Sequence, residues 1–167
     1  PRAGWLELTR TFCAGDRVEL RLPMPLRINR EAAGGVTIRR GPLLLALPIA
    51  AKRRVVRGKA PFTDVEMFPA SPWRYAAVES ALARAEVIVR EPGEFPFGED
   101  APPLIVRLFM APVVNWPMVR HSAGPIPKPQ VVESGALEEK TLVPYGCTRL
   151  RIAQFPIAAI KEETLCR

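Results

Sequence analysis

Few residues in this chain have the types and spacing that catalysis requires. Its single histidine, His121, would have to serve any Ser–His–Asp triad, and no GxSxG motif supplies the serine. Cys147 could act as a nucleophile only if a base such as His121 lay beside it in space. We favour the simpler interpretation of a small buried thiol and an unrelated loop histidine. The sequence therefore predicts no catalytic residue.

Acid–base hydrolysis needs two carboxylates held at a fixed separation around one bond. The acidic residues considered for this role, mostly in turns or loops, are Asp16, Asp64, Glu66, Glu99 and Asp100. No pair among them stands in an apolar setting, so we expect solvated or structural roles. There is no GxGxxG motif, no phosphate-binding loop and no CxxC pair. We therefore expect no cofactor and no metal site.

Aromatic side chains offer a different chemistry, because flat rings can stack on the apolar faces of sugars. Trp73 and Tyr75 stand in an alternating segment and are expected to be core residues. Trp116 lies in a proline-rich loop, where core packing and sugar contact are about equally expected. The same loop also carries a positive charge and the histidine. The candidate carbohydrate-contact residues are therefore Trp116, Arg120 and His121.

The composition favours strands over helices. Among the 167 residues are 19 prolines and 11 glycines, residues that break helix interiors and mark turns and strand ends. Short apolar runs between them predict an all-β fold, an antiparallel β-sandwich of the jelly-roll kind. No apolar run reaches the ~18 residues of a membrane span, and no membrane partner is expected.

The net charge of +7 raises the question of nucleic-acid binding. The basic residues are scattered, and the one short cluster is Lys52-Arg53-Arg54. No recognised nucleic-acid-reading module accompanies the charge, and many of the arginines suit water-facing strand positions that discourage edge pairing. Nucleic acid is therefore not an expected partner.

Period-two alternation predicts the strands of the first third. Trp5–Phe12 and Arg17–Leu22 flank a short turn and form the clearest predicted hairpin. Val36–Arg39 and Leu43–Leu47 are expected to be two halves of one long strand, kinked at Gly41-Pro42. The second half is apolar on both faces, so we expect it to be central.

The middle of the chain is less regular. Ala51–Phe62 is expected to be a basic surface loop. Trp73–Val78 and Ala85–Arg90 are expected to be strands, with a short helix over Ala76–Ala85 as an open alternative. Leu104–Met110 is nearly all apolar and is expected to be a strong strand.

The last third combines a long loop with a late strand. Residues 111–132 carry five prolines and lack periodicity, so they predict a surface loop. Leu142–Pro156, LVPYGCTRLRIAQFP, begins with a turn and continues with clean alternation, which predicts a closing strand. The tail from Ile157 to Glu163 is expected to be helical.

These elements suggest two small packed sandwiches. Residues 1–50 would form the C-terminal part of a first sandwich that lacks its N-terminal strands. Residues 51–70 would connect it to a second sandwich, residues 71–167, which carries the long loop at 111–132.

Six strand-and-turn motifs stand in order along the chain. They are Gly4-Trp5 through Thr11-Phe12, Gly15-Asp16-Arg17-Val18, Leu22-Pro23-Met24-Pro25, Arg40-Gly41-Pro42-Leu43, Pro72-Trp73-Arg74-Tyr75-Ala76 and LVPYGCTRLRIAQFP. In order and rough spacing, residues 4 to 156 resemble the C-terminal β-sandwich region of glycoside hydrolase family 127. That family contains β-L-arabinofuranosidase-like proteins, long catalogued as a domain of unknown function.

The resemblance implies a non-catalytic part of a carbohydrate-degrading enzyme. Its partner would be the N-terminal catalytic helical barrel of the same protein, which would carry all catalytic residues. It also implies a plant-type oligosaccharide as ligand and is compatible with a secreted or periplasmic parent. The alternatives are a stand-alone carbohydrate-binding module and, third, a basic nucleic-acid binder.

Overall fold

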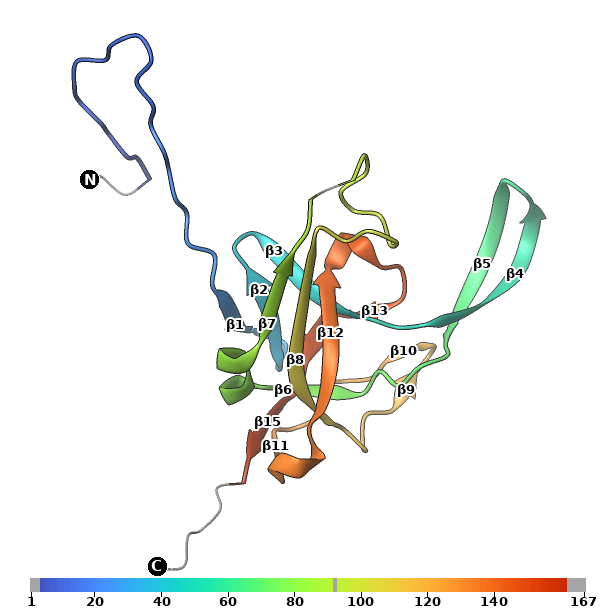
Figure 1. Cartoon of the computed structure of the whole chain (residues 1–167). Helices are drawn as coiled ribbons and strands as arrows, with labels where there is room; N and C mark the ends of the chain where they lie inside the picture. The colour runs from blue at the N-terminus through green and yellow to red at the C-terminus, as the bar shows by residue number, and fades with distance from the viewer. Residues whose placement is uncertain (1–3, 92, 162–167) are drawn as a thin grey trace, which may run out of the picture.

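The structure, a computed structural model, describes residues 4–91 and 93–161 (Figure 1). Its fold is all-β and sandwich-like, which confirms the predicted fold class. Of the described residues, 46% lie in strands and 8% in helix. No helix in this part of the chain is long and apolar enough to cross a membrane.

One large sheet of eleven strands dominates the structure. Eight strands form its main path, in the order β1 (Leu26–Arg30), β2 (Val36–Arg40), β3 (Leu43–Pro48), β12 (Glu138–Pro144), β8 (Leu104–Pro112), β6 (Tyr75–Val78), β15 (Ile157–Ile160) and β11 (Gln130–Val132). The pairs on this path are antiparallel, except that β15 runs parallel to β6 and to β11. Three strands pair beside it: β7 (Glu86–Val89) on β8, β13 (Arg151–Ile152) on β3 and β14 (Gln154–Phe155) on β2.

The β2 and β3 strands form a hairpin, so the prediction of one long kinked strand is wrong. Ile38 pairs with Leu45 and Arg40 pairs with Leu43 in antiparallel register. Gly41 has a φ of 55°, a left-handed conformation that lets the chain reverse rather than bend. The central position expected for Leu43–Leu47 is confirmed, because β3 lies between β2 and β12.

The large sheet joins the first and last parts of the chain. Ala46 and Leu45 of β3 pair with Val143 and Pro144 of β12. Residues on both sides of the segment 51–70 therefore contribute to one continuous sheet, which crosses the boundary that the sequence suggested between two sandwiches.

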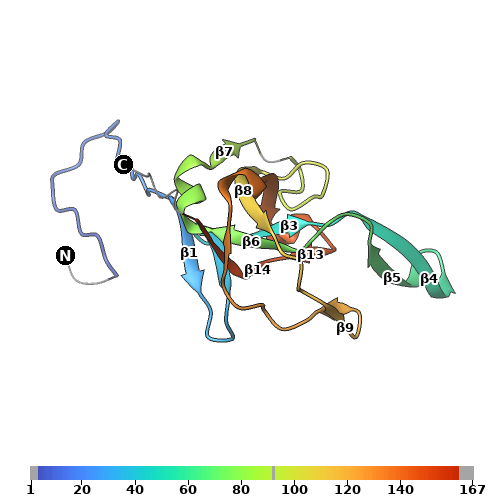
Figure 2. The same ribbon diagram turned by 90° about the horizontal axis from the view of Figure 1, so that it is seen from below.

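The segment 51–70 is itself a hairpin, and the expected loop over Ala51–Phe62 is wrong. Strands β4 (Ala51–Lys59) and β5 (Phe62–Pro69) pair with a bulge at Val55/Arg57 and project from the body (Figures 1 and 2). Every residue of β4 is exposed. Because neither face of β4 is buried, its sequence lacks the alternation of apolar and polar residues that would indicate a strand.

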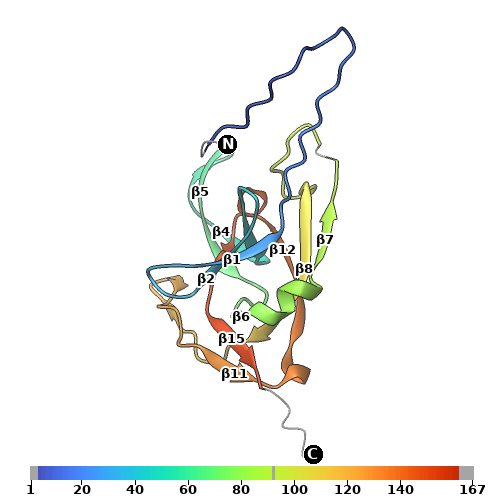
Figure 3. The ribbon, with the colours of Figure 1, turned by 90° about the vertical axis from the view of Figure 1, so that its left-hand side faces the viewer.

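Residues 4–25, which we call the N-terminal arm, extend away from the sheet without forming a strand (Figures 1 and 3). The turn expected between Trp5–Phe12 and Arg17–Leu22 is present: the carboxylate of Asp16 accepts the N–H of Cys13 at 3.0 Å. The paired strands predicted on either side of it are absent. A two-stranded ribbon with no third layer to cover it is only marginally stable.

The other predicted elements have mixed outcomes. Both expected strands around Glu79–Arg84 exist, as β6 and β7, and the short helix also exists between them as the 3-10 helix η1 (Glu79–Arg84). The prediction of a helical tail is wrong for Ile157–Ile160, because these residues form strand β15. Residues 162 and 163 lie outside the described residues.

The long loop and the closing strand are also subdivided. Residues 111–132 contain the end of β8, the small hairpin β9 (Met118–Val119) and β10 (Ser122–Ala123), and β11. After β12, the 3-10 helix η3 (Tyr145–Cys147) separates it from β13 and β14. The single closing strand predicted in LVPYGCTRLRIAQFP is therefore two short strands that pair with β3 and β2.

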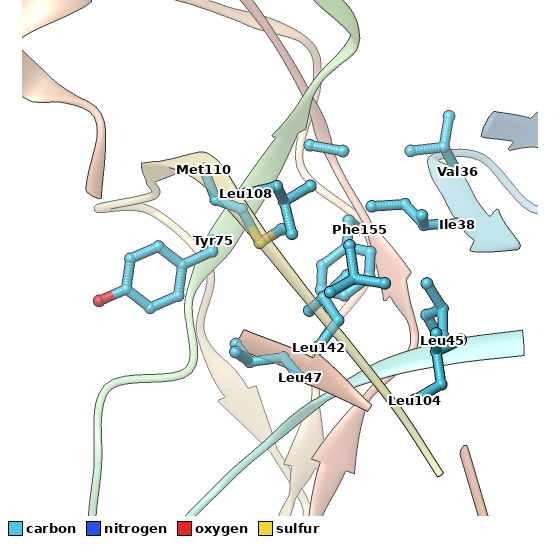
Figure 4. Close-up of a cluster of buried hydrophobic side chains, with 12 residues drawn as sticks. Val36, Ile38, Leu45, Leu47, Tyr75, Leu104, Leu108, Met110, Leu142 and Phe155 are labelled. Carbon is cyan, nitrogen blue, oxygen red and sulfur yellow. The ribbon is translucent and has the colours of Figure 1, made fainter. Parts of the chain in front are cut away.

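Strand β6 divides the core into two clusters. Successive side chains of a strand point to opposite faces, so Tyr75 and Ala77 join one cluster while Ala76 and Val78 join the other. The first cluster contains Val36, Ile38, Leu45, Leu47, Tyr75, Ala77, Leu104, Val106, Leu108, Met110, Leu142 and Phe155 (Figure 4). The second contains Ile49, Trp73, Ala76, Val78, Ala81, Ala111, Val113, Trp116 and Ala158.

Candidate functional site

Trp116, the first candidate carbohydrate contact, is a core residue in this structure. Its side chain is 1% exposed, and its ring lies edge-on to Trp73 with the ring centroids 5.2 Å apart. The indole Nε1–H donates to the carbonyl of Gly124 at 3.0 Å. A ring that is buried and hydrogen-bonded presents no face to a sugar, so core packing prevails at this position.

Arg120 and His121 form the exposed turn of the β9–β10 hairpin. Their φ values are 48° and 64°, so both adopt the left-handed conformation that a two-residue hairpin turn requires. The His121 ring lies edge-on to Phe68 of β5, with centroids 6.4 Å apart. The two residues stay accessible, but the structure does not combine them with an exposed Trp116 ring into one stacking surface.

The strain in this turn gives a stability prediction. Each non-glycine residue in the left-handed region costs ~1–2 kcal/mol, whereas Asn-Gly suits such a turn. Arg120→Asn with His121→Gly should therefore raise the free energy of unfolding by about 1 kcal/mol, since loss of the Phe68 contact offsets part of the gain. Urea denaturation measures this. The control, Arg120→Ala with His121→Ala, keeps the strain and should give no gain; an unchanged or lower stability for the Asn-Gly pair would contradict this account.

Cys147 and His121 contact different residues: Cys147 lies beside Pro96, whereas His121 lies beside Phe68. Cys147 is buried in η3, where its Sγ lies 3.9 Å from the carbonyl oxygen of Pro96. Burial raises the pKa of the Cys147 thiol, which therefore stays protonated at neutral pH. A protonated thiol without a base is a poor nucleophile. The structural interpretation of Cys147 holds.

Alkylation rates test this interpretation. Because the thiolate is the reactive form, buried Cys147 should react with iodoacetamide at least about tenfold more slowly than the exposed Cys13. Peptide mass spectrometry after timed quenching separates the two sites. In urea the two rates should converge. Equal rates in the folded protein would show that Cys147 is accessible and ionisable.

A polar cluster joins β6 to β12. The Tyr75 hydroxyl donates to Glu138 Oε2 at 2.8 Å, and Lys140 Nζ lies 2.7 Å from the same oxygen. Lys140 Nζ also lies 4.2 Å from the centroid of the Tyr75 ring. Register explains the meeting, because β6 and β12 both flank β8 and Glu138 is opposite Met110, as is Ala77.

The charges of this cluster are fixed at neutral pH. Hydrogen bonds from Lys140 and then from Tyr75 lower the pKa of Glu138. Burial alone would lower the pKa of Lys140, but its bonds to Glu138 and Tyr75 outweigh burial and raise it. Glu138 is therefore ionised and Lys140 is protonated at neutral pH. The sequence reasoning missed this cluster, since Tyr75 and Lys140 lie 65 positions apart in the chain.

The part of the chain that the structure describes holds no group of three or more His, Cys, Asp or Glu side chains that could bind a metal ion. Four of the five acidic candidates, Asp16, Asp64, Glu66 and Glu99, pair with arginines at the surface, and Asp100 is exposed. Such exposed ion pairs contribute little to stability.

The N-terminal arm exposes many large apolar side chains. Eight of its large apolar side chains are exposed: Trp5, Leu6, Leu8, Phe12, Val18, Leu20, Leu22 and Met24. Large exposed apolar surfaces often mark sites of interaction with a partner. The arm can therefore bind through apolar contacts and through its unpaired backbone groups, which are free to pair with another strand.

Comparison of the whole chain with known protein families, with curated proteins and with solved structures finds no match.

Proposed function

We propose that this chain is a non-catalytic β-sandwich that supports the catalytic helical barrel of a glycoside hydrolase resembling family 127. The observation that carries the proposal is the N-terminal arm, whose large apolar side chains are exposed. The six ordered sequence motifs supply the class of partner.

The arm has the properties of a segment that docks. Leu8 and Leu20 are exposed on opposite sides of the turn at Asp16, each within an alternating run of apolar and charged residues. Burying one leucine side chain stabilises a complex by ~1.5–3 kcal/mol. Several such side chains covered together are enough to offset the cost of ordering the arm against its partner.

Two alternatives have less support. A stand-alone carbohydrate-binding module keeps the exposed Arg120 and His121 but loses the Trp116 ring as a stacking platform. A nucleic-acid binder would use the projecting β4–β5 hairpin, yet two of its arginines are paired with Glu66 and Asp64. Binding by that hairpin would weaken steeply with salt, which distinguishes it from apolar docking.

An activity assay of this chain alone tests the proposal that it is non-catalytic. Aryl glycosides, including aryl arabinofuranosides, should show no turnover above the uncatalysed rate. The measurement is release of the aryl alcohol at several pH values. Turnover at an enzyme-like rate that Glu138→Gln abolishes would overturn the proposal, because it would place an acid or base in this chain. Glu86→Gln, an exposed carboxylate on β7, is the matched control for contaminating activity.

A further inference from the structure

A pocket of about 530 Å³ opens where three segments of the sheet end together. It lies between the segment from Pro69 to Tyr75, the end of β8 at Pro112-Val113 and the beginning of β12 at Glu138. No catalytic or docking role described above uses this pocket. Its lining combines apolar walls from prolines with one cation, one carboxylate and one phenol.

The cation of the pocket, Arg74, is held in place by the core beneath it. Its Nε–H donates to the carbonyl of Trp116 at 2.7 Å, and its guanidinium carbon lies 4.9 Å from the centroid of the Trp73 ring. The terminal Nη groups form no hydrogen bond or ion pair with the described residues. Arg74 therefore presents a pre-oriented fork of donors, which suits a carboxylate.

The carboxylate of the pocket is held just as firmly. Tyr75 and Lys140 both bind Oε2 of Glu138, at 2.8 and 2.7 Å. Its other oxygen, Oε1, receives no hydrogen bond from the part of the chain that the structure describes. Lys140 offsets the negative charge of Glu138. The positive charge of Arg74 therefore makes the net charge at the pocket positive. The pocket thus offers an anion site and a separate acceptor for a hydroxyl group.

We propose that this pocket binds a small sugar acid, with the carboxylate on Arg74 and a hydroxyl on Glu138. Pro69, Pro72 and Pro112 supply walls against which the C–H groups of a sugar ring can pack. A neutral sugar satisfies Glu138 but leaves Arg74 unpaired, so it binds more weakly. This proposal does not rest on the proposed function, because it concerns a different surface of the molecule from the N-terminal arm.

Amide chemical-shift titration of the whole chain tests the proposal, with glucuronate and glucose as probes that differ in one carboxylate. Glucuronate should shift the amides of Ala70, Arg74, Tyr75 and Glu138 with a Kd of about 1–10 mM. Glucose should bind at least about tenfold more weakly, because one charge-assisted interaction is lost. Absence of saturable shifts with glucuronate, shifts at another surface, or equal affinity for glucose would overturn the proposal.

Variants assign the anion site. Arg74→Gln should weaken glucuronate binding by at least about tenfold and leave glucose unchanged. Arg90→Gln, a change at an exposed arginine after β7, should alter neither affinity. Since Arg74 also contacts Trp73 and Trp116, Arg74→Lys provides a second variant that keeps the charge and the stem but removes the fork. It should weaken glucuronate by several-fold, and full affinity in either folded variant would contradict the assignment.

Discussion

Trp116→Ala is expected to lower the free energy of unfolding by ~3–5 kcal/mol, the usual cost of deleting a large buried aromatic side chain. The ring is 1% exposed, packs edge-on against Trp73 and donates a hydrogen bond to Gly124. The substitution removes all three interactions and leaves a cavity in the second core cluster. Urea denaturation followed by circular dichroism measures the change.

Trp5→Ala is the matched control, because Trp5 lies on the N-terminal arm and is 82% exposed. A substitution at such a surface position should change the free energy of unfolding by less than ~0.5 kcal/mol. If Trp116→Ala proved as harmless as Trp5→Ala, the ring would not be a core element. The interpretation of Trp116 as an exposed sugar platform would then be the better one.

Gly35→Ala should lower the free energy of unfolding by ~2–4 kcal/mol. Gly35 has a φ of 71°, which a residue with a Cβ adopts only with strain. A Cβ there would lie 2.5 Å from the carbonyl oxygen of Phe155, a backbone atom fixed by the pairing of β14 with β2. The substitution therefore pushes apart two paired strands.

Gly34→Ala separates the two causes, since Gly34 has a φ of 90° but a Cβ added there would meet no atom within 4 Å. It should cost only the conformational part, about 1–2 kcal/mol. The difference between the two variants in thermal or urea unfolding reports the clash with Phe155. Equal losses would mean that the contact between Gly35 and β14 is not tight.

The sequence predicted the buried strands well because burial leaves a pattern. In β8, every second residue from Leu104 to Met110 is buried, and in β6 all residues from Tyr75 to Val78 are buried. These segments carry apolar side chains wherever the sheet needs them. The same reasoning predicted a central position for Leu43–Leu47, and the structure confirms it.

Elements without a buried face could not be predicted in this way. Strand β4 is exposed throughout and is held by pairing with β5 and by ion pairs such as Arg54 with Glu66. The N-terminal arm shows the opposite case: it has a strand-like alternation, but its large apolar side chains are exposed. An apolar pattern indicates that a segment is suited to burial; it does not identify what buries it.

Candidate site residues were the hardest to predict, because they depend on contacts between distant segments. The proline content of residues 111–132 favoured an exposed loop, whereas Trp116 packs into the core beside Trp73, 43 positions earlier. Arg74, which directly precedes β6, and Glu138, the first residue of β12, line one pocket because β6 and β12 both flank β8. The spacing of these residues in the sequence predicts neither the packing of Trp116 on Trp73 nor the shared pocket of Arg74 and Glu138.

If the N-terminal arm docks on a catalytic barrel, as we propose, sedimentation measures the association directly. The chain should form an equimolar complex with a helical barrel of the family 127 type. Leu8→Asp with Leu20→Asp should weaken it at least about tenfold, because two apolar contacts are replaced by charges. Glu7→Gln with Glu19→Gln, the adjacent charged positions, should leave the complex intact. No complex, or a complex insensitive to the leucine changes, would show that the arm does not dock on the barrel through these side chains.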